Sequence, residues 1–171
     1  SGRQDDVREG LQRIDGLLQR IAGLTGHLKT FARKSPAGLS ERLCLSDVLE
    51  QALQLLAPRL RSEQVQLHSK IDSRARVLGD AIRLEQVLLN LLRNAIDANR
   101  EAHPGHSSRI ELSAAEQDGQ LCVRVWDQGP GVAQGELEHI FTPFYTSKAE
   151  GLGLGLSMSR SIIEGFGGAL E

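Results

Sequence analysis

Several features are scarce in this chain of 171 residues, and each scarcity narrows what the chain can be. No run approaches the roughly 20 apolar residues that a membrane-spanning helix needs, and no signal peptide opens the sequence. The formal net charge is −2, so no overall basic field indicates a nucleic-acid partner. We therefore expect a soluble, cytoplasmic chain. The alternative that it is the cytoplasmic part of a membrane-anchored parent stays open.

Cysteine is also scarce. Cys44 and Cys122 lie far apart in the sequence, and neither belongs to a CxxC motif. Each stands in an alternation of apolar residues, which favours a place in the core over a metal site or a disulfide. This usage fits a reducing compartment. The chain is 40% hydrophobic and 25% charged, which is enough apolar material for one globular domain.

One long amphipathic segment runs from about residue 5 to residue 33. Its apolar residues follow a 4-3-4-3 spacing from Val7 to Leu28, as in a helix of a bundle or coiled coil. Pro36 and Gly38 then end the pattern. We predict a helical segment at 1–35, a linker at 36–40 and a separate domain at 41–171.

The second domain alternates strand and helix patterns. A helix at 45–60 has Ser46 as its candidate N-cap, and a hairpin turns at Asp118–Gly119. Further strands are predicted at 42–45, 65–71 and 75–80, and the last two are expected to be neighbours. Further helices are predicted at 81–102 and at 154–168, the second closed by Gly165. A short helical turn is predicted at 135–140. Strands on one face and three helices on the other predict an α+β fold, a two-layer α/β sandwich. We expect part of its sheet to lie beyond Glu171.

Two asparagines interrupt an otherwise apolar helix pattern in "LLNLLRNAIDA". Asn90 and Asn94 are four residues apart, so they share one helix face. Buried amides need partners, and capping a neighbouring strand would supply them. Alternatively, a neutral amide oxygen is a suitable Mg²⁺ ligand beside phosphates.

An aspartate ends a strand pattern in "VWDQGPGV". One interpretation is a tight turn in which Asp127 accepts a hydrogen bond from its own backbone. The other is a carboxylate that accepts from the exocyclic amine of a base, with Gly129 and Gly131 leaving room for a flat ring. In the nearby "IFTPFYTSK", Phe141 and Phe144 are expected to anchor the core, whereas Thr146 and Lys148 could serve a phosphate.

Three glycines at two-residue spacing open the last helix pattern in "GLGLGLS". Glycine inside a regular element lowers stability, so Gly151, Gly153 and Gly155 need a reason, such as a backbone that must approach a ligand closely. The free N–H groups at the start of a helix are suited to binding an anion. The pattern is neither a P-loop nor GxGxxG, so by itself it is weak evidence.

In this order and spacing, the four stretches resemble the N, G1, F and G2 boxes of the GHKL ATPase superfamily, and in particular the ATP-binding domain of sensor histidine kinases. The short lid, which is the stretch between Phe144 and Gly151, and the motif "TSK…GLGLGLS" resemble the nitrogen- and dicarboxylate-sensing group of these kinases. The resemblance covers residues 40–171 and implies the Bergerat fold. The segment "RIDGLLQRIAGLTGHLKTFARK" is similar to the second helix of the family's dimerisation and phosphotransfer hairpin.

The resemblance implies roles for individual residues. Asn94 would bind Mg²⁺, with Asn90 as its neighbour on the same face, and Asp127 would read the adenine amino group. Gly129 and Gly131 would let the backbone pass the base, and Thr146 and Lys148 would flank the triphosphate. The lid and the helix start would bind phosphate oxygens through Gly151, Leu152, Gly153, Leu154, Gly155 and Leu156.

One departure from the family affects the expected activity. The family's phosphoacceptor histidine is followed directly by an acidic residue, and none of the five histidines fits. His103 and His106 flank a Pro-Gly pair, where a solvated turn is favoured over a metal pair. The resemblance therefore implies a histidine kinase that binds ATP and Mg²⁺ but does not phosphorylate itself as this chain. It also implies a homodimeric parent and a response regulator receiver domain as partner.

Two alternatives remain open at this stage. One is a nucleotide-binding switch module that transfers no phosphate. The other is a GHKL ATPase that hydrolyses ATP, which needs a general base where this chain has Asn90.

Overall fold

The computed structural model describes residues 41–148 and 151–171. The helical segment predicted at 1–35 and the linker at 36–40 lie outside the described residues. Thr146–Leu152 falls outside the compact unit formed by Leu39–Tyr145 and Gly153–Glu171, so each of these parts is considered by itself.

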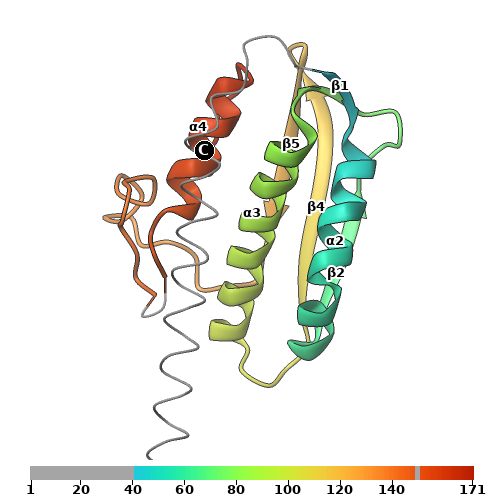
Figure 1. Ribbon diagram of the computed structural model, residues 1–171. Coiled ribbons are helices and arrows are strands. Elements are labelled where there is room, and N and C mark those ends of the chain that lie inside the picture. Colours follow the sequence, from blue (N-terminus) through green and yellow to red (C-terminus); the bar gives the residue numbers. More distant parts are fainter. Residues whose placement is uncertain (1–40, 149–150) are drawn as a thin grey trace, which may run out of the picture. The chain divides into compact units, whose positions relative to one another are not determined.

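The larger unit has two layers, with helices covering one face of the sheets (Figure 1). This architecture confirms the predicted α+β sandwich. Within the described residues, no helix combines the length and the apolarity of a membrane span. In chain order, the elements are β1 (Glu41–Cys44), α2 (Leu45–Ser62), β2 (Val65–Lys70), β3 (Arg76–Gly79), α3 (Ala81–Ala102), β4 (Ser108–Gln117), β5 (Gln120–Trp126) and α4 (Gly155–Gly165).

The strands form two sheets. In the larger one the order is β2-β4-β5, with β2 parallel to β4 and β4 antiparallel to β5. Helix α3 makes the crossover from β3 to β4 on one face. In the smaller sheet, β1 pairs antiparallel with β3. The prediction that β3 neighbours β2 is therefore wrong. The Leu45 N–H donates to the Ala75 carbonyl (3.1 Å), which ties the start of α2 to the segment before β3 and so brings β1 beside β3.

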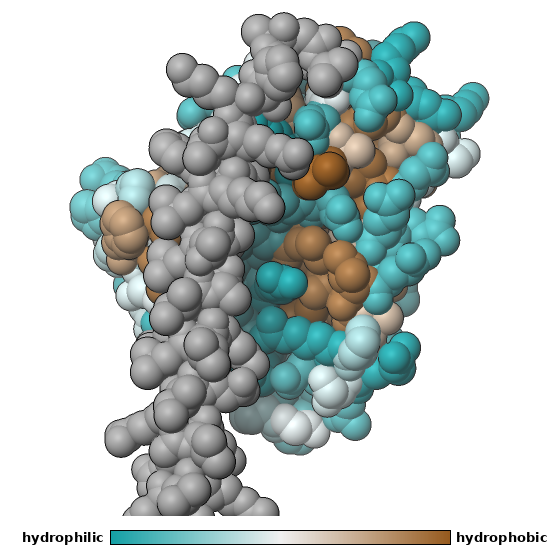
Figure 2. Space-filling view, in the orientation of Figure 1, coloured by the Kyte–Doolittle hydropathy of each residue, from teal (hydrophilic) through white to brown (hydrophobic). Residues whose placement is uncertain are grey.

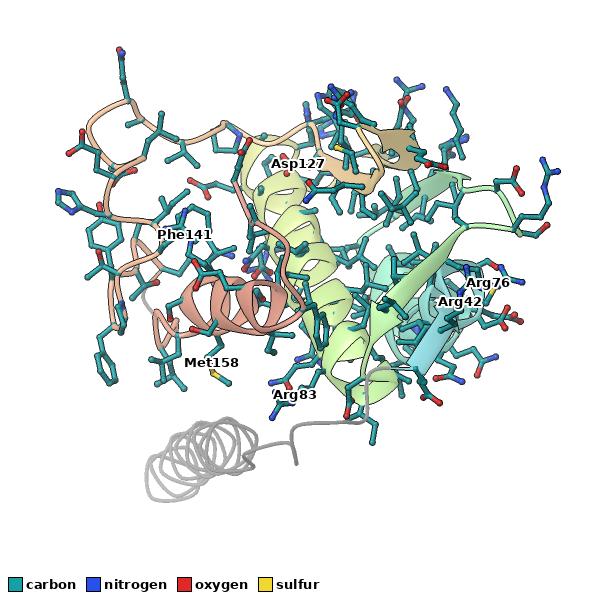
Figure 3. The ribbon with its side chains drawn as sticks, turned by 90° about the horizontal axis from the view of Figure 1, so that it is seen from above. Arg42, Arg76, Arg83, Asp127, Phe141 and Met158 are labelled. Atoms are coloured by element: carbon teal, nitrogen blue, oxygen red, sulfur yellow. The ribbon has the colours of Figure 1, made fainter. Side chains whose placement is uncertain are left out.

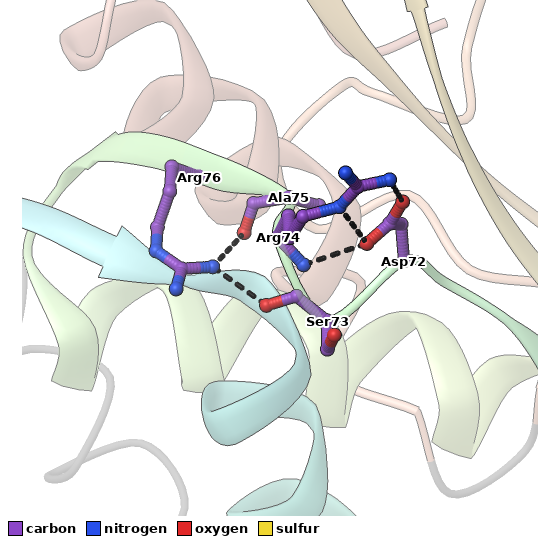
Figure 4. Close-up of polar contacts among 5 residues, drawn as sticks. All are labelled: Asp72, Ser73, Arg74, Ala75 and Arg76. Carbon is purple, nitrogen blue, oxygen red and sulfur yellow. Dashed lines mark hydrogen bonds and ion pairs between the residues drawn. The ribbon is translucent and has the colours of Figure 1, made fainter.

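A polar turn separates β2 from β3 (Figure 4). The Asp72 carboxylate accepts from the Arg74 backbone N–H at 2.8 Å and from its guanidinium at 3.2 and 3.0 Å. The Arg76 guanidinium donates to the carbonyls of Ser73 (2.7 Å) and Ala75 (3.2 Å). Chiefly through the side-chain hydrogen bond from Arg74, and then through the backbone one, the pKa of Asp72 falls from 3.8 to about 2.

The core lies between α2, α3 and the sheets. Leu92 and Ile96 of α3 and Ile110 and Leu112 of β4 have no exposed surface. Burying a side chain of this size contributes about 1.5–3 kcal/mol, so these residues hold the two layers together. Figure 2 shows the outer face of the helices, which is turned away from the core. Patches of apolar residues on this face are bordered by polar side chains.

The starts of two helices differ from each other. Helix α3 begins as predicted, and the Asp80 side chain caps it by accepting from the Arg83 N–H (2.9 Å). The N-cap of α2 is Cys44, so the assignment of Ser46 as N-cap is wrong. The hydroxyl of Ser46 lies 3.0 Å from the Cys44 sulfur instead.

The turns and the two cysteines were also predicted from the sequence. The hairpin turns at Asp118–Gly119 as predicted, with φ of 53° and 76° that suit a type I′ turn. Residues 135–140 contain the predicted helical turn, in which the Ile140 N–H donates to the Glu136 carbonyl (3.0 Å). Cys44 and Cys122 are free thiols but only partly buried, so their expected place in the core is wrong.

Candidate functional site

One face of α3 carries the two predicted asparagines. Asn90, Asn94 and Ala98 follow one another at four-residue intervals and therefore lie in a row. The Asn90 amide donates to the buried Ser159 hydroxyl of α4 (3.0 Å). A Cβ added to Gly155 would lie 2.2 Å from the Asn90 side-chain oxygen. The first asparagine thus joins α3 to the start of α4 and does not cap a strand.

The other end of the row meets the loop after β5. A Cβ on Gly129 would lie 2.4 Å from the Ala98 Cβ, so only glycine lets this loop come so close to α3. The Asp127 Oδ1 accepts from the Gly129 N–H (2.8 Å), which is the turn foreseen as one interpretation. Among the described residues, nothing donates to Oδ2. The turn therefore leaves one carboxylate oxygen available, and base recognition stays a prediction.

The row also places Asn94. With a rise of 1.5 Å per residue, Asn90 and Ala98 are separated by about 12 Å along α3. Asn94 lies midway and is half-buried. Figure 3 shows Asp127 near the C-terminal end of α3 and Phe141 beside α4. The structure therefore brings Asn90, Asn94 and Asp127 to one side of α3, in an order that runs from α4 to the β5 loop.

The start of α4 is suited to an anion. Its N-cap is Leu154, and within the described residues no side chain caps its N–H groups and no acidic residue lies in its first turn. Unpaired amides and the positive end of a helix dipole attract negative charge. Gly155 and Leu156 open this helix, as the glycine-rich pattern predicted.

The segment before α4 is shaped by left-handed backbone. Gly153 has φ of 65°, and a Cβ there would lie 2.4 Å from the Phe144 carbonyl carbon. The Phe144 N–H donates to the Gly153 carbonyl (2.9 Å). Phe144 itself has φ of 68° and its side chain is 73% exposed, so its predicted role as a core anchor is wrong.

Phe141 is held differently. The Arg160 guanidinium of α4 lies 3.5 Å from the centre of the Phe141 ring, a cation–π contact. Near it, the Tyr145 hydroxyl donates to the Glu136 carboxylate (3.2 Å). Burial, and then this hydrogen bond, raise the pKa of Tyr145. These contacts fix the loop of residues 131–145, in which Gly131 has φ of 76°.

The segment Thr146–Leu152 contains the remaining predicted residues. The Thr146 hydroxyl accepts from the Lys148 N–H (3.1 Å), and the Gly151 N–H donates to the Lys148 carbonyl (3.1 Å). A Cβ on Gly151 would lie 2.4 Å from the Thr146 hydroxyl. Only glycine therefore fits at 151 beside the Thr146 hydroxyl. That Thr146, Lys148, Gly151 and Leu152 bind phosphate stays a prediction.

Sequence reasoning missed a second group of residues. Asn99 has no exposed surface, and its amide donates to the Arg109 carbonyl (3.1 Å) while its Oδ1 accepts from the Gln128 N–H (2.7 Å). His103 Nε2 lies 3.0 Å from the Gln128 carbonyl, and His106 Nδ1 lies 3.0 Å from the Pro104 carbonyl. The signal was present, because Asn99 continues the apolar face of Leu92 and Ile96 at helical spacing.

Comparison with known proteins agrees with this geometry. A family model described as "Histidine kinase-, DNA gyrase B-, and HSP90-like ATPase" matches residues 79–171. The C4-dicarboxylate transport sensor protein DctB of Rhizobium meliloti (strain 1021) is 38% identical over an alignment of 172 positions, which covers 99% of this chain and 27% of that protein. The chain thus spans about a quarter of the length of the curated relatives it matches.

Two solved structures share the fold. The catalytic domain of histidine kinase ThkA has a TM-score of 0.65 and 31% identity, over 74% of this chain and 80% of that one. ThkA in complex with the response regulator protein TrrA has a TM-score of 0.66 and 27% identity, over 88% and 43%. The family match runs from the end of β3 to the last residue and includes Asn90, Asn94, Asp127 and the start of α4. This chain belongs to the family of histidine kinase-, DNA gyrase B- and HSP90-like ATPases.

Proposed function

We propose that this chain is the ATP-binding catalytic domain of a two-component sensor histidine kinase. Its parent would transfer the γ-phosphoryl group of ATP to a histidine outside this chain, and from there to an aspartate of a response regulator. The observation that carries the proposal is the row on α3, which has the start of α4 at one end and the Asp127 loop at the other. An elongated nucleotide needs such a site, with an anion-binding end and a base-binding end.

Each residue of the row has a role in this proposal. The Oδ2 of Asp127 accepts a hydrogen bond from the adenine amino group, while Gly129 and Gly131 shape the loop beside the base. The N–H groups of residues 151–156 bind phosphate oxygens, and Thr146 and Lys148 flank the triphosphate. Catalysis of this kind consists mainly of positioning and charge neutralisation.

Magnesium fits the donor that the row offers. Mg²⁺ prefers oxygen ligands and keeps several waters or phosphate oxygens in its shell. The Asn94 amide, half-buried between the two ends of the row, supplies one neutral oxygen. When bound, the ion would neutralise charge on the phosphates.

The partners follow from the proposed activity. ThkA, a structural neighbour, has been solved with a response regulator protein. We propose a receiver domain as the partner of the parent protein, and a homodimeric, cytoplasmic kinase region. An ATPase that hydrolyses its substrate is disfavoured, because a general base is needed where this chain has Asn90, and a carboxamide cannot take a proton from water.

Asp127 offers the decisive test. Adenine presents an amino group where guanine presents a carbonyl oxygen, and a carboxylate accepts from the first and repels the second. Asp127→Ala should weaken ATP binding by about 2–4 kcal/mol, tens- to several hundredfold. Asp127→Asn can still accept from the Gly129 N–H through Oδ1. Its amide would then offer a donor to the base and shift the preference toward GTP.

The measurement is a titration of ATP and GTP against all three proteins, with a melting curve of each without nucleotide. If Asp127→Asn melts like the unaltered chain and keeps its ATP-over-GTP ratio, then Asp127 only forms a turn. The proposed site would then be wrong.

A further inference from the structure

The backbone of Gln128, the residue after Asp127, is held at both of its polar groups by the C-terminal end of α3 and its C-cap residue. The Gln128 N–H donates to the Asn99 Oδ1 at 2.7 Å, and the Gln128 carbonyl lies 3.0 Å from His103 Nε2. A carbonyl oxygen can only accept, so His103 carries a proton at Nε2. The two partners are four residues apart: Asn99 lies in the last turn of α3, and His103 is its C-cap, whose N–H donates to the Asn99 carbonyl (2.8 Å). We name the three residues Asn99, Gln128 and His103 the Gln128 clamp.

The clamp is also anchored to the sheet. The Asn99 amide donates to the Arg109 carbonyl (3.1 Å), and the Gln128 side-chain oxygen accepts from the Arg109 N–H (2.7 Å). Asn99 has no exposed surface, so its hydrogen bonds are shielded from water and costly to lose. Both backbone polar groups of Gln128 and its side chain are therefore tied to rigid elements.

This arrangement bears on Asp127, which is the residue before Gln128. Within residues 41–148 and 151–171, the Gly129 N–H alone donates to the Asp127 carboxylate, and Gly129 is the residue after Gln128. The direction of the carboxylate thus depends on the Gln128 backbone that the clamp holds between them. A hydrogen bond that selects one base over another requires that direction to be fixed.

We propose that Asn99 and His103 are positioning residues for base recognition, which act by holding the Gln128 peptide and thereby aiming the free oxygen of Asp127 at the base. The proposal rests on the proposed function, because it names residues that support the same site. Neither residue touches the nucleotide. A merely structural link between α3 and the sheet would lower stability without changing which base is preferred.

The test compares nucleotide preference in clamp variants and matched controls, all in the full chain. Asn99→Ala should lower the ATP-over-GTP ratio by about tenfold, the effect of one lost hydrogen bond. His103→Ala removes the other half of the clamp from a partly exposed helix end and should lower the ratio by about threefold. His106→Ala is its control, since His106 faces the Pro104 carbonyl in the same loop and not Gln128. Leu49→Ala, in the core of α2, controls for lost stability alone.

A double substitution and hydrogen exchange separate positioning from stability. In the Asp127→Ala background, Asn99→Ala should weaken ATP binding no further, because the group it aims is gone. Exchange of the Gln128 amide should accelerate in Asn99→Ala while amides of the α2 core stay protected. If Asn99→Ala does not fold, the test is the ATP-over-GTP ratio of His103→Ala compared with that of its control His106→Ala.

The outcomes distinguish this inference from the proposed function. If the unaltered chain shows no preference for ATP over GTP, the proposed function fails. If it does prefer ATP and Asp127→Ala abolishes that preference, but the clamp variants keep the ratio of their controls, then only the positioning role is overturned.

Discussion

Asn90 of α3 and Gly155 of α4 are in such close contact that no larger residue fits at 155. A Cβ on Gly155 would lie 2.2 Å from the Asn90 side-chain oxygen, and the amide of Asn90 is itself held by Ser159 one turn further along α4. The hydrogen bond to Ser159 and the close approach to Gly155 thus hold the start of α4 against Asn90. The proposed phosphate-binding amides belong to that helix start, so Asn90 also sets their position.

Gly155→Ala should therefore destabilise the chain. Alanine is the better helix former by up to about 1 kcal/mol, but overpacking against a held side chain costs about 1–3 kcal/mol. We expect a net loss of about 1–2 kcal/mol in the free energy of unfolding, measured with urea, together with weaker ATP binding. Gly165→Ala is the matched control, because nothing lies within 4 Å of a Cβ at the other end of the same helix. Equal stability of the two variants would show that Asn90 yields without cost.

Asn94→Ala should reduce the contribution of magnesium to nucleotide binding. If the Asn94 amide is a metal ligand, ATP affinity should fall in the presence of Mg²⁺ and change little in EDTA. The melting temperature without nucleotide serves as the control for folding. If the ratio of affinities with and without Mg²⁺ equals that of the unaltered chain, Asn94 has a structural role only.

The turn between β2 and β3 should respond to acid at an unusually low pH. The pKa of Asp72 lies at about 2, below its ordinary 3.8, so the turn is stabilised above pH 3.8. That stabilisation is lost as the pH falls through about 2. An NMR titration of the Asp72 carboxyl should show this midpoint, and Arg74→Ala should return it toward 3.8. A midpoint that stays low in Arg74→Ala would mean that another group holds the carboxylate.

Local patterns were sufficient for the elements themselves. Residues 81–102 form a helix with the predicted bounds, and the hairpin turns at Asp118–Gly119, because helical periodicity and turn chemistry act between near neighbours. Ser46 shows the limit of such signals. It has a favoured N-cap side chain, yet the helix starts one residue earlier, where the contact with Ala75 holds the chain.

Pairings between distant residues could not be read in the same way. The pairing of β3 with β1, the outward ring of Phe144 and the Gln128 clamp each depend on contacts between segments that are separated in the chain. No spacing rule encodes such contacts, since they arise only when the layers pack.

The sequence by itself determined the four motifs, their order and the helix that carries Asn90 and Asn94, because these follow from residue type and local spacing. Tertiary structure alone decided which polar atoms of these residues remain available to a ligand. It committed Asn90 to Ser159 and one oxygen of Asp127 to Gly129, and it left the other oxygen without a donor among the described residues. The physical reason is that a buried polar group must be satisfied by whatever packing brings near it, and packing is a property of the whole fold.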